Sequence, residues 1–426
     1  MMINTMTNLF ASIFDRDEIL EWARETGAVK RLRDIHPADL ALALVHCAIG
    51  DETRSIATAR RALFDLTKYM PEESSFYNRL NSGLPMLMKR LFERALAAGT
   101  LEQRKVLAAA LEGSGILDIE AIDGSQITLP ASASMRFPST NEFHGGVKLT
   151  ASLSVLFQNI TSVTLTDART HDRKALKLPR WLHGRLCLID RGYADHSLWA
   201  TIEDRHGFFL TPLKSSTTPR IREIRSGVST KHIGNPLSGE LSYWNEVDVD
   251  ADFYVRKRGR RTFRVVAIPV SKNLSDGTVE TTSLWFVTNL PPELFSAQQI
   301  ATIYRLRWEV EQLFRTLKMV GRLDHLRSAN PNVIHAFIYA TLLGMALSHN
   351  ICTLMRRARP DCEPSQFRVT ALVLRSLPEI IAAVGSERMQ SVLEDFEHAL
   401  WREGTNPNPG RPYRSVRYAQ ELLNVA

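Results

Sequence analysis

Cysteine is scarce in this 426-residue sequence, and its four cysteines lie far apart. They stand at Cys47, Cys187, Cys352 and Cys362, and no two of them form a CxxC pair. Disulfide frameworks and structural zinc sites need regularly spaced cysteines, so we expect neither. The scarcity is typical of a protein from a reducing compartment and predicts a cytoplasmic location.

The sequence also lacks a recognisable secretion signal and a long uninterrupted apolar run. The first fourteen residues have no basic start followed by an apolar stretch and a small-residue cleavage site. The most apolar segment, residues 333–355, is interrupted by His335, Ser348, His349 and Asn350. We therefore predict a buried core helix there, and a soluble protein with no membrane partner.

Neither sign of charge dominates strongly. Lys and Arg number 53 against 46 Asp and Glu, which leaves a formal net charge of +7. This modest basic excess favours a polyanionic partner, although the sequence has no polybasic tail. With 44% hydrophobic residues the chain can bury a sizeable core, and its length allows two or three domains.

The hydrophobic period changes along the chain and predicts an α/β fold. Residues 1–110 have a helical period, with helices expected at residues 37–49, 52–68 and 75–98. The pair 52–68 and 75–98 is compatible with a helix-turn-helix on DNA phosphates, and a solvated helix face explains it equally. Residues 1–110 are thus a helical region, with DNA-end binding as its expected role.

Residues 111–215 have the period of strands. Three runs, ILDIEAID, KLTASLSVLF and ITSVTLTDA, predict an antiparallel meander. The buried-looking strand RLCLID, a helix and the strand GFFLTPLK follow, which indicates a mixed α/β layer. Residues 216–290 alternate again and predict a β-rich insertion.

A strong helix is predicted over residues 296–320, inside a segment 291–330 that follows the insertion. Ser296 is its N-cap candidate, and Gln299 stands three residues on as the partner of a capping box. Residues 331–426 are predicted to be helical and to close with a Pro/Gly-rich tail. We expect this last region to contribute to dimerisation.

The helix predicted at 296–320 has a polar stripe beside its apolar face. At about 100° per residue, Arg307, Glu311 and Lys318 lie within roughly 60° of Tyr304. A carboxylate at the rim of a core can be held rigidly beside basic groups that meet phosphates. An amphipathic helix with an Arg307–Glu311 ion pair explains the stripe as well. Glu309, at roughly 140°, is predicted to point to solvent.

The four residues of this stripe, spaced as in YRLRWEVEQLFRTLK, resemble the YREK signature of DDE transposases of the insertion-sequence-four family. The resemblance extends upstream to IDGSQI and to LIDRGYADHSLW, and it covers roughly residues 116–329. It implies an RNase H-like catalytic core, interrupted by a β-rich insertion and flanked by helical regions. In such a core the first acid lies on strand one, the second on strand four and the third on a late helix.

The resemblance implies that Asp123, Asp190 and Glu311 are the catalytic residues and metal ligands of a DNA transposase. Three carboxylates can hold two Mg²⁺ ions, which Mn²⁺ can replace. Asp123 is expected at the end of the first strand and Asp190 at the end of a later one. From the residues alone, Asp118 and Glu120 compete with Asp123 for the position on strand one.

Further DNA contacts are expected around this centre. The resemblance implies that Tyr304, Arg307 and Lys318 bind the phosphate backbone near the cleaved end. Trp285 is a candidate to stack on a flipped base, although a strand Trp is also typical of a core. A basic block around Gly259 predicts a hairpin that binds phosphates, unless it is merely solvated. Its members are Arg256, Lys257, Arg258, Arg260, Arg261 and Arg264.

The expected activity is cut-and-paste transposition of an insertion sequence by metal-dependent strand cleavage and strand transfer. The expected partners are double-stranded DNA, as the terminal inverted repeats of the element and as target, and a second copy of the chain in a homodimer. The expected location is the bacterial nucleoid. Two other interpretations stay open: a nuclease of the same fold without strand transfer, and a catalytically silent DNA-binding protein descended from a transposase.

Overall fold

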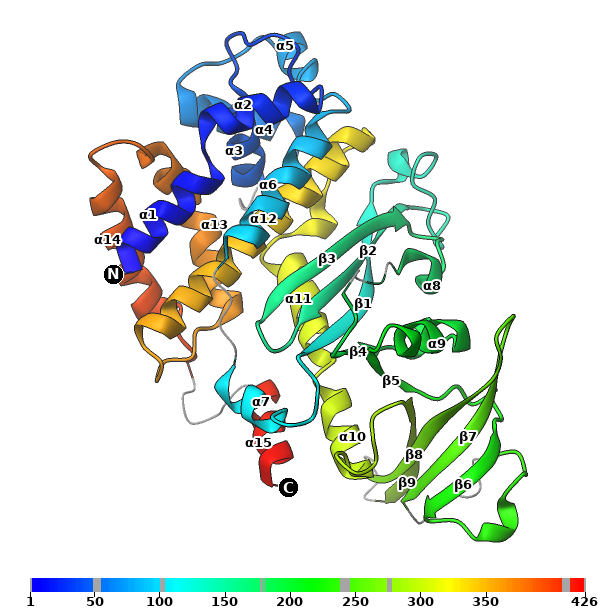
Figure 1. Cartoon of the computed structure of the whole chain (residues 1–426). Helices are drawn as coiled ribbons and strands as arrows, with labels where there is room; N and C mark the ends of the chain where they lie inside the picture. The colour runs from blue at the N-terminus through cyan, green and yellow to red at the C-terminus, as the bar shows by residue number, and fades with distance from the viewer. Residues whose placement is uncertain are drawn as a thin grey trace.

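The computed structural model describes residues 2–48, 55–99, 104–176, 178, 181–237, 246–273, 278–407 and 414–424. Helices from both ends of the chain gather at one end of the molecule, and a nine-stranded sheet extends away from them (Figure 1). The predicted α/β class is therefore confirmed as a mixed fold with helical regions on either side of the sheet in sequence.

Seven helices precede the sheet among the described residues. Pro37 opens α3 at the first helical position, as its fixed φ favours. Two helices near the N-terminus were not predicted, although Asp15 caps α2 by accepting from the Glu18 amide. Residues 52–54 of the predicted second helix lie outside the described residues. The helices are α1 Met2–Ile13, α2 Arg16–Glu25, α3 Pro37–Cys47, α4 Ile56–Thr67, α5 Glu73–Tyr77, α6 Leu84–Ala98 and α7 Lys105–Ala110.

The long helix α12, Pro331–Ala358, is the centre of the helical end and packs against α3, α6 and α13. It is long and apolar enough to cross a membrane, but 94% of its most apolar window is buried inside the protein. The predicted core helix is thus confirmed. Gly344 lets α13, Gln366–Ala383, approach closely, because a Cβ there would meet Leu374 Cδ2 at 2.1 Å.

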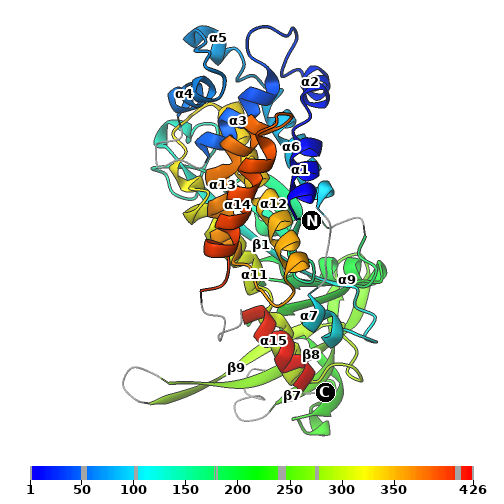
Figure 2. The same ribbon diagram turned by 90° about the vertical axis from the view of Figure 1, so that its left-hand side faces the viewer.

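Two more helices end the described chain, α14 Met389–Glu403 and α15 Arg414–Asn424. The prediction of a tail was wrong for α15, whose period is strongly amphipathic. Figure 2 shows α15 beside α7, apart from α12, α13 and α14. It also packs against α10, Ala297–Arg305, where the Arg305 guanidinium lies 5.6 Å from the Tyr418 ring centroid.

The strands form one sheet in the order β3-β2-β1-β4-β5-β9-β8-β7-β6. The predicted meander is confirmed, since β2 pairs antiparallel with both β1 and β3. β4 runs parallel to β1 and to β5, and β5 then pairs antiparallel with β9. The strands are β1 Asp118–Leu129, β2 Gly145–Ser154, β3 Asn159–Asp167, β4 Arg185–Ile189, β5 Phe208–Pro212, β6 Arg220–Ser226, β7 Val247–Val255, β8 Gly259–Asn273 and β9 Val279–Thr288.

Helices cover both faces of the middle of the sheet. Alternate residues of β4 point to opposite sides, so Cys187 and Ile189 join the core under α9, His196–Asp204. Leu186 and Leu188 join the larger core, which includes α10 and α11, Trp308–Met319. Asp190 has the parity of Leu186 and Leu188, so its side chain belongs to the face that carries α11.

Candidate active site

Two aspartates lie side by side where the parallel strands β1 and β4 separate. The parallel register pairs Asp118 with Arg185 and ends with Ile122 opposite Ile189. One further step places Asp123 opposite Asp190. The carboxyl ends of parallel strands are the usual place for a site in an α/β sheet.

Asp123 does not end its strand, contrary to the prediction. β1 continues to Leu129, because its other edge stays paired with β2 up to Gly145. Only the parallel pairing with β4 stops before Asp123. Asp190 does end its strand, and its side chain accepts from the Gly192 amide at 3.5 Å at the start of a short 3-10 turn.

The helix predicted over residues 296–320 is divided into α10 and α11. Its capping box is confirmed, with Ser296 and Gln299 exchanging hydrogen bonds. A tight turn interrupts it, since the Arg307 amide donates to Tyr304 O and the Val310 amide to Arg307 O, each three residues back. The stripe therefore comes from three pieces: Tyr304 from α10, Arg307 from the turn, and Glu311 from α11.

Arg307 joins two of the three predicted catalytic acids. Its Nη1 donates to Asp123 Oδ2 at 3.2 Å and its Nη2 to Glu311 Oε1 at 2.5 Å. Tyr304 Oη donates to Asp190 Oδ1 at 3.5 Å. The structure thus brings all three acids, Tyr304 and Arg307 into one cluster. Burial raises the pKa of Asp123 to about 6, and the charges of Asp190 and Glu311 add to this rise against the effect of Arg307.

Lys318, the fourth residue of the stripe, lies further along β1. Its Nζ donates to Gln126 O at 2.8 Å and lies 3.8 Å from Asp324 Oδ2. Glu309 was predicted to point to solvent, and this prediction was wrong. Its side chain is 19% exposed and lies 3.9 Å from Arg104, because α7 is followed closely by β1 and brings Arg104 against α11.

The two competing acids of β1 are in a different environment. Asp118 accepts from Ser154 Oγ at 2.8 Å, Glu120 accepts from Thr161 Oγ1 at 2.6 Å, and both contact Arg185. Both acids are almost fully buried. The carboxylates of Asp118 and Glu120 thus find their hydrogen-bond partners on neighbouring strands of the sheet. Asp123 is the acid of β1 that faces α11.

The three acids offer the oxygen ligands that bind a divalent metal ion, but the positively charged guanidinium of Arg307 already contacts two of them. Carboxylate oxygens are the ligands that Mg²⁺ prefers. Yet in the described part of the chain no three His, Cys, Asp or Glu side chains lie close enough to share an ion. The guanidinium lies between Asp123 and Glu311. A metal shared by these two acids therefore requires Arg307 to leave at least one of them.

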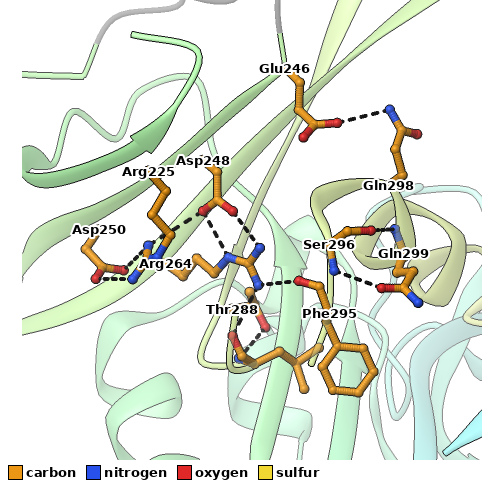
Figure 3. Close-up of polar contacts among 11 residues, drawn as sticks. Arg225, Glu246, Asp248, Asp250, Arg264, Thr288, Phe295, Ser296, Gln298 and Gln299 are labelled. Carbon is orange, nitrogen blue, oxygen red and sulfur yellow. Dashed lines mark hydrogen bonds and ion pairs between the residues drawn. The ribbon is translucent and has the colours of Figure 1, made fainter. Parts of the chain in front are cut away.

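A buried ion-pair network ties the far strands to the start of α10 (Figure 3). Arg264 on β8 donates to both carboxylate oxygens of Asp248 on β7, at 3.0 and 2.6 Å. Its Nη1 donates to Phe295 O at 2.8 Å and to Leu290 O at 3.4 Å, in the loop before α10. Arg225 on β6 contacts Asp248 at 3.6 Å. The prediction that Arg264 binds phosphates was wrong, because it is buried at this junction and 4% exposed.

The rest of the basic block forms the turn between β7 and β8. Arg258 and Arg261 form salt bridges with Asp204 at the end of α9, at 2.8 and 2.9 Å. The remaining three members are exposed and form no salt bridge with any described residue. They are Arg256, Lys257 and Arg260.

Trp285 is not brought to Tyr304. It packs with the core under α9, whereas its neighbour Phe286 contacts the Tyr304 ring on the other face, with centroids 5.0 Å apart. A stacking role for Trp285 near the cluster stays a prediction.

Asp172 is a further acid near the cluster, missed by the sequence analysis. A Cβ on Gly192 would meet Asp172 Oδ2 at 2.8 Å and Asp190 Oδ2 at 4.0 Å. Lys148 on β2 neutralises Asp172, with Nζ 2.7 Å from Oδ1. The motif HDRK at residues 171–174 contains this acid, but its sequence has no metal-ligand spacing that would have identified it.

Comparison with known proteins finds a matching family and related proteins. A family described as "Transposase DDE domain" matches residues 117–347, more than half of the chain. The transposase for insertion sequence element IS421 of Escherichia coli is 27% identical over 369 residues, covering 80% of this chain and 92% of that protein. The transposase for insertion sequence element IS231F of Bacillus thuringiensis subsp. israelensis is 20% identical over 428 residues, covering 90% and 88%.

Proposed function

Because the chain belongs to the transposase DDE domain family and is a DNA transposase, we propose that Asp123, Asp190 and Glu311 form its catalytic centre. The observation that carries this proposal is the register of β1 and β4, which sets two of the acids side by side. Arg307 links the third acid to the first. The family implies dependence on a divalent metal ion, and we propose Mg²⁺, with Mn²⁺ as a substitute.

The finer classification that we propose is the insertion-sequence-four family, with Tyr304, Arg307, Glu311 and Lys318 as its YREK signature. The strand order β3-β2-β1-β4-β5 supports an RNase H-like core, and β6 to β9 correspond to the insertion. We propose that the chain is divided into the regions 1–110, 111–215, 216–290, 291–330 and 331–426. The strands of the insertion prolong the core sheet through the pairing of β5 with β9.

When bound, the metal ions would activate the attacking oxygen and stabilise the leaving oxygen of a phosphodiester. The three carboxylates would hold them, and Tyr304 orients Asp190 through its hydroxyl. Arg307 has a planar fork of donors, so on release from Asp123 it can bind a phosphate bidentately. Lys318 adds a point charge further along the same face of β1 and α11.

For the DNA partners, we propose terminal inverted repeats and target DNA, processed by cut-and-paste transposition in a bacterial homodimer. A dimer is expected because two ends must meet before joining. The exposed Arg256, Lys257 and Arg260 support phosphate binding at the hairpin, with Arg258 and Arg261 beside them. The N-terminal helices are proposed to bind the ends.

Two variants of one helix test the catalytic centre. The substrate is a DNA fragment with the inverted repeats that flank the gene, incubated with Mg²⁺. Glu311→Gln removes one proposed ligand and should abolish cleavage while DNA binding persists. Glu309→Gln, the same change two residues earlier, should leave cleavage intact, because Glu309 contacts Arg104 instead. Normal cleavage by Glu311→Gln would refute the assignment, and a pre-cleaved 3′-OH end that never joins plasmid DNA would indicate a nuclease.

A further inference from the structure

A basic groove lies at α8, Asp172–Ala175, and the start of α9, in the part of the chain that precedes and follows Asp190. Its volume is about 500 Å³. It reaches from the segment after Asp190 to the hairpin between β7 and β8. The basic side chains that line it are His171, Arg173, Lys174, His196, Lys214 and Arg256.

The positive charge of this groove is only partly neutralised within the protein. Asp195 is the one acid among its lining residues, and it is already paired with Arg173 at 3.2 Å. Lys214 Nζ donates to a neutral acceptor, Ala194 O, at 3.0 Å. Lys174 and Arg256 form no salt bridge with any residue that the structure describes. Such a surplus of fixed cations attracts a polyanion.

An aromatic side chain stands in the same groove. Tyr254 is 70% exposed, although its backbone is fixed in β7 and its carbonyl oxygen lies 2.9 Å from His196 Nδ1. The exposed ring of Tyr254 therefore lies beside Arg256, which forms no salt bridge with any described residue. Proteins that bind single-stranded nucleic acid combine such a basic groove with aromatic rings on which bases stack.

The groove begins a few residues after Asp190 along the chain. Only the short turn Arg191–Tyr193 separates Asp190 from Ala194, the residue whose carbonyl accepts from Lys214. A DNA strand bound at Asp190 would therefore have the groove within a short turn of the same chain.

We propose that this groove binds an unpaired DNA strand that extends from the catalytic carboxylates, with phosphates on Lys214, Lys174 and Arg256 and a base on Tyr254. The proposal rests on the proposed function, because it takes Asp190 as part of the cleavage site. It assigns the groove, with Arg256, to the unpaired strand next to the cleaved bond and leaves the duplex to the other basic surfaces, Lys257 and Arg260 among them.

The test compares two labelled probes of arbitrary sequence: a blunt duplex, and the same duplex with an unpaired extension of about 10 nucleotides. The full-length protein should bind the extended probe more tightly. Tyr254→Ala should weaken binding of the extended probe by at least about fivefold, as expected for the loss of one stacked base. Binding of the blunt duplex should stay unchanged.

The cations are tested by salt dependence on the extended probe. Replacing Lys174 and Arg256 together by Gln should lower the slope of log affinity against log salt by about 1.4, for two lost contacts to a single strand. The control is Arg388→Gln, at an exposed position outside the groove, which should change the affinity for neither probe.

The proposal would be overturned if these variants lost the same affinity for both probes, or lost affinity for neither. Tyr254, Lys174 and Arg256 are all on the surface, so the unfolding midpoints of both variants should match the wild type. Failure here leaves the cleavage test with Glu311→Gln unaffected, so the two proposals fail separately.

Discussion

Breaking the buried pair Arg264–Asp248 should strongly destabilise the protein, because it leaves the Asp248 carboxylate without its main partner. Arg264→Met keeps the length of the side chain but removes its charge and four hydrogen bonds. Asp248 then keeps only the longer contact to Arg225, and the Phe295 carbonyl loses its donor. Removing one partner of a buried ion pair costs about 3–5 kcal/mol. We expect Arg264→Met to lower the free energy of unfolding by that amount.

The assay is urea unfolding, followed by tryptophan fluorescence, with two comparison variants. Arg225→Met in the same network is the matched control, because its pair with Asp250 is more exposed and should be worth about 1 kcal/mol or less. Adding Asp248→Leu to Arg264→Met should recover much of the loss, since no unpaired charge then stays buried. If Arg264→Met lowers the free energy of unfolding no more than Arg225→Met does, the network does not hold α10 in place.

Three further predictions concern the acids and their partners. Tyr304→Phe keeps the ring on Phe286 but loses the contact with Asp190, so stability should change little while Mg²⁺-dependent cleavage falls about tenfold; unchanged cleavage would contradict this. Arg307→Gln removes the cation that lies between two carboxylates, so Mg²⁺ should raise the thermal midpoint more than in the wild type; an equal rise would count against competition. Burial raises the pKa of Glu120 from 4.5 to about 7, so the folded state binds more protons and stability should fall as pH rises through that window. Glu120→Gln cannot titrate and should flatten this fall in urea unfolding at pH 5 and 7, whereas an unchanged slope would refute the role of Glu120.

Local patterns predicted much of the fold, because they depend on neighbouring residues. The alternation in β1, β2 and β3 predicted the meander, and the apolar period of α12 predicted a core helix. The capping box at Ser296 was correct for the same reason. Helices α1 and α2 were missed, and α15 was taken for part of a tail.

The failures depend on contacts between distant segments. Arg264 belongs to a dense basic run, and only pairing with β7 and packing under α10 make it a buried partner of Asp248. Glu309 has the helical phase of a solvated residue, but α7 brings Arg104 against it. The tight turn at Arg307 divides a helix whose sequence carries no Pro or Gly. Such features follow from tertiary packing, which periodicity cannot report.

The packing of α15 against α10 and α7 has a consequence for synthesis on the ribosome. Arg305 contacts both Tyr418 and Glu421, so the helix that carries Tyr304 is braced by residues translated long after it. From Glu311, the last of the three acids, to Arg414 the ribosome adds 103 residues (414 minus 311), which takes roughly 5 to 20 seconds at typical rates. During that interval the nascent chain already contains all three acids but lacks the helix that supports α10. The emerging protein should therefore complete its proposed catalytic centre only once α15 has left the exit tunnel, well after Glu311 has been translated.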